Sequence, residues 1–217
     1  MGAPLVEFDV QLTRDGHVVV IHDPTVDRTT SGHGRVGEMS LVEVRALSAG
    51  YPERFGDRYF GERVPTLAEV LAFLRGRMRA MIEIKPDSVS DDAVAGIEAR
   101  TIQEVRRQGM SDDLALVSFD TRALRRCRDL APEIARGHLF AHRHKDAVAA
   151  AMEVGAQVVM PEKEMLSVEL RDLTKAAGLK LATWVVDDPK ELVDLERFEL
   201  YGLATNRPGV MIEALTD

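Results

Sequence analysis

The sequence has one cysteine and no long apolar run, and each scarcity excludes a class of protein. Cys127 alone makes no intrachain disulfide, so the chain is not a disulfide-stapled scaffold. Its neighbours are arginines and not a histidine, which favours an inert thiol over a catalytic nucleophile. No apolar run reaches the length of a membrane span, and residues 1–10 lack a signal-peptide pattern. We therefore expect no stable membrane insertion and a cytoplasmic location.

Positive charge is also scarce, because 28 Lys and Arg residues face 36 Asp and Glu residues, for a formal net charge of -8. The densest basic stretch, 122–128, fits the exposed side of an amphipathic helix, so we expect no nucleic-acid partner. A phosphate substrate is still compatible, because a bound cation and a few local bases can dominate the field inside a cleft. The 217 residues are 45% hydrophobic, and we expect one domain over residues 1–217. The oligomeric state is not predicted.

From residue 65 onward, short β-rich runs alternate with longer helical patterns, which predicts βα units and a parallel sheet. Strands are expected at 80–85, 114–119, 134–140, 156–160, 181–186 and 201–205. Helices are expected at about 66–75, 89–109, 121–131, 144–154, 167–177 and 189–198. Thr66 and Glu69 have the spacing of a capping box at the start of the first of these helices.

The first 64 residues follow another pattern. Residues 6–12 and 17–22 predict two strands joined by a tight turn containing Asp-Gly, which makes a hairpin. Residues 23–64 form a turn-rich insertion with one short helical pattern near 40–48, and such excursions usually cover or build a site. The fold class is therefore α/β, a TIM-type (β/α)8 barrel represented by seven βα units with a hairpin and a small insertion after the first strand. A closed barrel needs eight units.

Two pairs of charged residues interrupt strands of this predicted barrel. Alternation places Glu7 and Asp9 on one face of the first strand, and Glu83 and Lys85 on one face of the next. Catalytic residues of TIM-type barrels lie at the C-terminal ends of strands, and carboxylate oxygens suit Mg²⁺ or Ca²⁺. Glu7, Asp9 and Glu83 are thus candidate metal ligands. A solvated strand face and a salt bridge within one strand are the competing interpretations.

Three further side chains lie near strand ends. His22 ends the hairpin, which returns it toward the first carboxylate pair, where a histidine could act as general acid or base. Phe119 and Trp184 could wall a substrate pocket with their apolar faces, although core packing explains them equally well. His142 and His144, on the loop after residue 140, are weaker candidates.

Several motifs occur in one order along nearly the whole chain, and together they resemble the glycerophosphodiester phosphodiesterase family. They are Glu7-Phe-Asp9 with the hairpin to His22-Asp23-Pro, Asp27-Arg-Thr-Thr, Pro65-Thr-Leu-Ala-Glu, Ile82-Glu83-Ile-Lys85, Ser118-Phe119-Asp120, Thr183-Trp184-Val-Val-Asp-Asp-Pro and Thr205-Asn-Arg-Pro. The resemblance implies a metal-dependent hydrolase that splits a glycerophosphodiester into glycerol 3-phosphate and an alcohol.

The resemblance also implies roles for individual residues. Glu7, Asp9 and Glu83 would hold a divalent cation, usually Mg²⁺ or Ca²⁺, and His22 would be one of two acid/base histidines. Lys85 would bind phosphate, while the insertion at 23–64 would cover the site. A phospholipase D-like phosphodiesterase shares these motifs and is an alternative.

The resemblance is incomplete at one end. Members of the family open with a strand ending in His-Arg-Gly and a helix starting near Glu-Asn-Thr, and neither motif occurs here. We expect the sequence to represent a member that lacks the first βα unit and, with it, the first catalytic histidine; an export signal could have been lost too. The activity of these residues alone is left open. The alternative is a catalytically impaired fragment or metal-binding pseudoenzyme, which would bind a cation far better than it hydrolyses a phosphodiester.

Overall fold

The computed structural model describes residues 2–141 and 146–216. Within them, one eight-stranded sheet runs in the order β2-β1-β3-β4-β5-β6-β7-β8. β1 pairs antiparallel with β2, and all other neighbouring strands are parallel. The strands are β1 (Leu5–Leu12), β2 (Val18–Val20), β3 (Arg79–Ile84), β4 (Leu114–Ser118), β5 (Ala135–Phe140), β6 (Val158–Pro161), β7 (Lys180–Thr183) and β8 (Gly202–Leu203).

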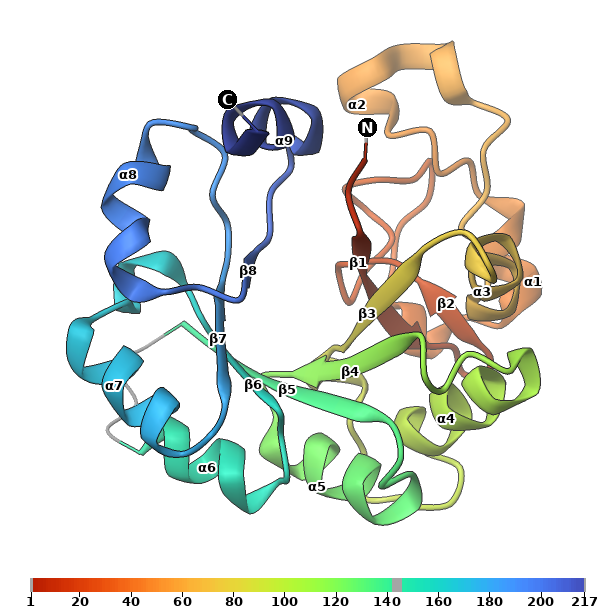
Figure 1. Cartoon of the computed structure of the whole chain (residues 1–217). Helices are drawn as coiled ribbons and strands as arrows, with labels where there is room; N and C mark the ends of the chain where they lie inside the picture. Colours follow the sequence, from red (N-terminus) through yellow and green to blue (C-terminus); the bar gives the residue numbers. More distant parts are fainter. Residues whose placement is uncertain (1, 142–145, 217) are drawn as a thin grey trace.

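A helix follows each parallel strand before the next one begins. The α-helices are α1 (Leu41–Ala46), α2 (Pro52–Phe55), α3 (Leu67–Leu74), α4 (Ile97–Gln108), α5 (Thr121–Leu130), α6 (Ala147–Glu153), α7 (Val168–Ala176), α8 (Glu191–Leu195) and α9 (Pro208–Thr216). Short 3-10 turns are η1 (Val36–Glu38), η2 (Gly56–Tyr59), η3 (Pro86–Ser88), η4 (Lys163–Met165) and η5 (Glu196–Phe198). Figure 1 shows the sheet curling round on itself, with α4 to α7 along its outer side.

This arrangement confirms the predicted TIM-type layout of seven βα units with a hairpin after the first strand. The capping box of Thr66 and Glu69 is present at the start of α3. In the part of the chain that the structure describes, the ladder does not pair β8 with β1, and β2 and β8 are its two ends. None of the described helices is long and apolar enough to cross a membrane.

Both faces of the curled sheet are apolar over most of their area, as a parallel sheet covered by helices requires. The outer face packs Val10, Ile82 and Leu116 against α3, α4 and α5. The inner face carries a separate cluster around Leu139 and Met160. The few charged side chains that point inward are therefore exceptions that need partners.

The helix expected at 89–109 begins eight residues later, so that its predicted start is wrong. Residues 86–88 form η3, and the Asp92 carboxylate accepts hydrogen bonds from the backbone N–H groups of Val94 and Ala95. Such local side-chain bonds offer the backbone an alternative to the helix. The helix starts only after Gly96, which is its N-cap.

The insertion has a small apolar cluster of its own. Val26, Val36, Val44 and Val64 are buried together with Val19 of β2. The cluster attaches residues 23–64 to the hairpin that carries His22. Ser40 and Glu43 add a capping box at the start of α1.

The buried guanidinium of Arg136 supports the helix layer, and its replacement gives a stability prediction. Arg136 on β5 is 4% exposed, and its guanidinium donates to the carbonyls of Ile134 (2.6 Å) and Gly155 (3.0 Å), with longer bonds to Ala131 and Val154. Burial lowers the pKa of Arg136. Arg136→Met removes these buried hydrogen bonds, although Gly155 O keeps a bond from Gln157 Nε2 and Ala131 O one from Ile134 N. We expect a loss of about 2–5 kcal/mol in the free energy of unfolding, measured by urea denaturation.

The matched control for Arg136 is Arg125→Met. Arg125 pairs with Glu153 at the surface, where both side chains are more than 40% exposed. Exposed ion pairs contribute little, so this variant should change stability by less than about 1 kcal/mol. Equal midpoints for the two variants would contradict the role given to Arg136.

Candidate active site

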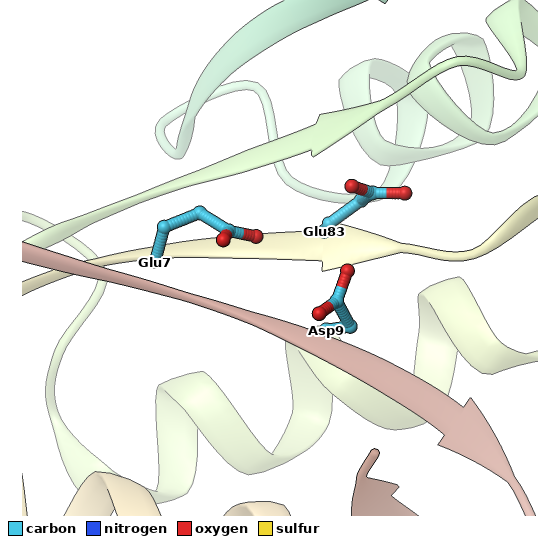
Figure 2. Close-up of side chains that lie close together, drawn as sticks. All are labelled: Glu7, Asp9 and Glu83. Atoms are coloured by element: carbon cyan, nitrogen blue, oxygen red, sulfur yellow. The ribbon is translucent and has the colours of Figure 1, made fainter. Parts of the chain in front are cut away.

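Strand register brings three carboxylates together. Asp9 of β1 lies opposite Glu83 of β3, and Glu7 lies two residues earlier on the same face of β1. Each of the three offers an oxygen within 4.8 Å of the others. Figure 2 shows the side chains projecting from the same side of the two strands, with the Glu7 carboxylate reaching toward the other two.

Lys85 partly neutralises this cluster. Its Nζ lies 2.8 Å from Glu83 Oε1 and 3.4 Å from Asp9 Oδ1. The side chains of Lys85, Asp9 and Glu83 are only 10–15% exposed. One ammonium group thus faces three carboxylates, and the local charge is negative when all are ionised.

The excess of negative charge and the burial of these groups shift the pKa values of Glu7, Glu83 and Lys85. Partial burial of the carboxylate, followed by the charges of Asp9 and Glu83, raises the pKa of Glu7 to about 8, although the residue as a whole is exposed. Burial also raises the pKa of Glu83, against the opposing effect of Lys85. For Lys85 itself, burial works to lower the pKa, but the two carboxylates outweigh it and the pKa is raised. Without a bound cation, full ionisation of the three carboxylates is therefore unfavourable.

A divalent cation fits these residues. The donors are hard carboxylate oxygens, the kind that Mg²⁺ and Ca²⁺ prefer. Glu83 Oε1 is buried and has no well-aligned hydrogen bond among the described residues, despite the nearby ammonium. A cation between Glu7, Asp9 and Glu83 would satisfy this oxygen and the excess charge together.

Cation binding should therefore depend on pH. The pKa of Glu7 is raised from 4.5 to about 8, so between these values the cation-free folded protein holds a proton that the unfolded chain has lost. Stability of the cation-free protein should fall as pH rises through this window. A cation must displace the proton, so affinity should rise as pH approaches about 8.

Calorimetric titration with Mg²⁺ measures this effect. In two buffers with different ionisation heats, we expect the release of about one proton or more per cation near pH 6, and less above pH 8. Binding without proton release near pH 6 would contradict the raised pKa of Glu7.

The hairpin places His22 at the same end of the sheet. The backbone N–H of Ile21 donates to Asp9 O (3.1 Å), and Gln11 Nε2 donates to His22 O (3.3 Å). His22 Nδ1 lies 2.7 Å from Asp23 Oδ1, and the imidazole is 62% exposed.

Phe119 and Trp184 meet across the inner face of the sheet. Their rings are 5.6 Å apart with an interplanar angle of 86°, and both pack against the cluster around Leu139 and Met160. Trp184 Nε1 donates to Met160 O at 3.0 Å. The two aromatic residues form an apolar wall, and their indole and phenyl faces are part of the inner packing as well.

Sequence reasoning did not foresee the hydrogen bonds between polar groups that connect the loops around the site. Gln11 accepts a hydrogen bond from the Ser88 hydroxyl, which joins β1 to η3. Asp187 accepts from Thr205 Oγ1 and from Asn206 N and Nδ2 at 2.7–2.9 Å, which joins the ends of β7 and β8. For Ser88, Asp187 and Asn206 the position after a strand was the available signal, whereas Gln11 lies within β1. The weaker candidates His142 and His144 lie outside the described residues.

Comparison with known proteins shows which class of protein this chain resembles. The chain is 34% identical over 213 residues to a glycerophosphodiester phosphodiesterase of Caldanaerobacter subterraneus subsp. tengcongensis, covering 98% of this chain and 86% of that protein. It superposes with a TM-score of 0.90, at 26% identity, on the structure of an Oleispira antarctica phosphodiesterase in complex with the product sn-glycerol-3-phosphate. That match covers 100% of this chain and 86% of the other.

A second solved structure agrees with the first. A putative glycerophosphoryl diester phosphodiesterase from Silicibacter pomeroyi has a TM-score of 0.88 and 27% identity, covering 100% of this chain and 84% of that one. The fold is thus shared with phosphoric diester hydrolases. Residues 1–210 match the model of the glycerophosphoryl diester phosphodiesterase family, and the chain belongs to that family.

Proposed function

We propose that this protein hydrolyses glycerophosphodiesters to glycerol 3-phosphate and an alcohol, using a divalent cation held by Glu7, Asp9 and Glu83. The observation that carries the proposal is the convergence of these carboxylates within 4.8 Å in a chain of this family. The product-bound Oleispira antarctica structure supports glycerol 3-phosphate as the phosphate-containing product.

Each nearby side chain has a task in this reaction. Bound Mg²⁺ or Ca²⁺ would supply charge stabilisation at the phosphate oxygens. Lys85, which now contacts two of the carboxylates, would be free to contact a phosphate oxygen as a point charge once a cation takes over their charge. Phe119 and Trp184 would line the apolar side of the substrate.

His22 is the proposed acid/base residue. Its Nδ1 is held by Asp23, so Nε2 is the ring atom that exchanges a proton with the alcohol oxygen or with water. Water supplies its hydroxyl to phosphorus and a proton to the alcohol, while the phosphorus–oxygen bond to the alcohol breaks. The cytoplasm as location, the covering of the site by residues 23–64 and the absence of a nucleic-acid partner stay predictions from the sequence.

The direct test is an assay of the purified protein on glycerophosphocholine with Mg²⁺, with Ca²⁺ and with chelator. We expect glycerol 3-phosphate and choline, and no turnover after chelation. Hydrolysis of sphingomyelin in preference to glycerophosphocholine would indicate the phospholipase D-like alternative. Cation binding without turnover of either substrate would instead indicate a cation-binding protein that does not catalyse.

A further inference from the structure

His22 needs help to present its ring in one orientation. Its backbone is tied to β1 through the bonds of Ile21 and Gln11, but its side chain is 62% exposed. A mobile imidazole also exists in two neutral tautomers, of which only one leaves Nε2 ready to accept a proton. A residue that holds Nδ1 would remove both sources of disorder.

Asp23 is in position to do so. Its Oδ1 lies 2.7 Å from His22 Nδ1, and the carboxylate is only 21% exposed. Hydrogen bonds from Arg28, before the smaller contribution of His22, lower the pKa of Asp23 to about 2. Asp23 is thus an anion near neutral pH, and an anion accepts the proton of Nδ1–H.

Arg28 fixes the carboxylate in turn. Its Nε donates to Asp23 Oδ2 at 2.6 Å and its Nη2 donates to Oδ1 at 2.9 Å. The guanidinium therefore makes a two-point, bidentate contact with the carboxylate. A two-point contact sets the plane of the carboxylate as well as its distance, so the oxygen facing His22 cannot swing away.

The insertion supplies the last support. The Arg28 guanidinium lies over the Tyr51 ring, 5.6 Å from its centroid, and Tyr51 N donates to Thr29 O at 3.1 Å. Tyr51 holds this place with a left-handed φ of 50°, which is uncommon for a bulky residue and implies that the surroundings impose it. We call His22, Asp23, Arg28 and Tyr51 the His22 support network.

We propose that Asp23 and Arg28 are positioning residues for His22, and that the insertion supports the network through Tyr51. The inference rests on the proposed role of His22. Neither Asp23 nor Arg28 is proposed to touch the substrate, so their loss should lower kcat with little change in KM. On this view residues 23–64 hold the acid/base group in addition to any covering of the site.

The test compares Asp23→Asn with a matched neighbour, Asp27→Asn. Asp27 also lies beside a histidine, His33, and bonds to Gly34 N, but it makes no contact with His22. We expect kcat of Asp23→Asn to fall about 10²–10³-fold with KM nearly unchanged. This lies between the roughly 10–100-fold loss for a residue that orients a metal ligand and the roughly 10⁴-fold loss for an aspartate that sets a histidine tautomer. Asp27→Asn should stay within about twofold of wild type, the range of a surface change outside the network.

Ring nitrogen NMR of selectively labelled histidine gives a second readout that does not depend on turnover. In spectra of the neutral form, the His22 ring should carry its proton on Nδ1 in the wild type and show a tautomer mixture in Asp23→Asn. Arg28→Lys keeps the charge but not the two-point contact, and it tests the network even if Asp23→Asn fails to fold. We expect it to lower kcat about tenfold.

Comparison with His22→Ala separates the two levels of the proposal. If His22→Ala leaves kcat unchanged, the acid/base role itself is wrong. If His22→Ala abolishes turnover while Asp23→Asn and Arg28→Lys keep the wild-type kcat and His22 tautomer, the support network is wrong. In the double variant, Asp23→Asn should add no further loss to His22→Ala; an undiminished additional loss would also overturn the network.

Discussion

Glu83→Gln should lower the affinity for Mg²⁺ or Ca²⁺ by about 10²-fold or more. Loss of a residue that only orients a metal ligand lowers affinity by about 10–100-fold, and Glu83 is itself a proposed ligand. Hydrolysis should fall with the affinity. Glu83 is the most buried of the three carboxylates, with a side chain 10% exposed, and its Oε1 lacks an aligned hydrogen bond within the described residues. Glutamine keeps the shape but removes the charge that a cation needs. Calorimetric titration gives the affinity, and a glycerophosphocholine assay gives the activity.

Glu98→Gln is the matched control for this change. Glu98 on α4 is 1% exposed and pairs with Arg126 at 3.2 Å, so it is a buried carboxylate with one cationic partner, as Glu83 is. It lies in the helix layer, away from the acidic cluster, and its replacement should leave cation affinity unchanged. Equal affinity losses in the two variants would mean that general destabilisation, and not lost coordination, explains Glu83→Gln.

The fold could be predicted because buried parallel strands have a clear sequence pattern. The expected strand 80–85 is β3 (Arg79–Ile84), and the expected strand 114–119 is β4 (Leu114–Ser118), because β-branched and apolar runs between helices have few other stable arrangements. The start of α4 could not be predicted in the same way. There the Asp92 turn competes with the helix through bonds within three residues, and hydrophobic periodicity does not detect them.

The candidate site could be predicted in part. Alternation puts Glu7 and Asp9 on one face, but only the register of β1 against β3 sets Asp9 opposite Glu83. The contact between Phe119 and Trp184 depends on how far the sheet curls, which no short-range pattern encodes. Sequence reasoning likewise gave no sign of the contact between Arg28 and Tyr51, because it depends on the irregular backbone of the insertion.

His22→Ala should lower kcat by about 10²–10⁴-fold, the usual contribution of a general acid or base. Cation affinity should stay within about threefold of wild type, because the imidazole is not one of the three grouped oxygen donors. The two effects together distinguish a proton-transfer group from a metal ligand, since loss of a ligand lowers both quantities. Steady-state kinetics at saturating cation gives kcat, and calorimetric titration gives the affinity.

His17→Ala is the control at the other end of the same hairpin. His17 lies beside Asp15, with Nδ1 3.4 Å from Oδ1, and its side chain is 52% exposed, so it repeats the histidine–aspartate pairing away from the acidic cluster. This variant should retain both kcat and cation affinity. If His22→Ala lowered cation affinity as strongly as Glu83→Gln does, His22 would belong to the metal site; if it left kcat at the wild-type value, another group would carry the proton.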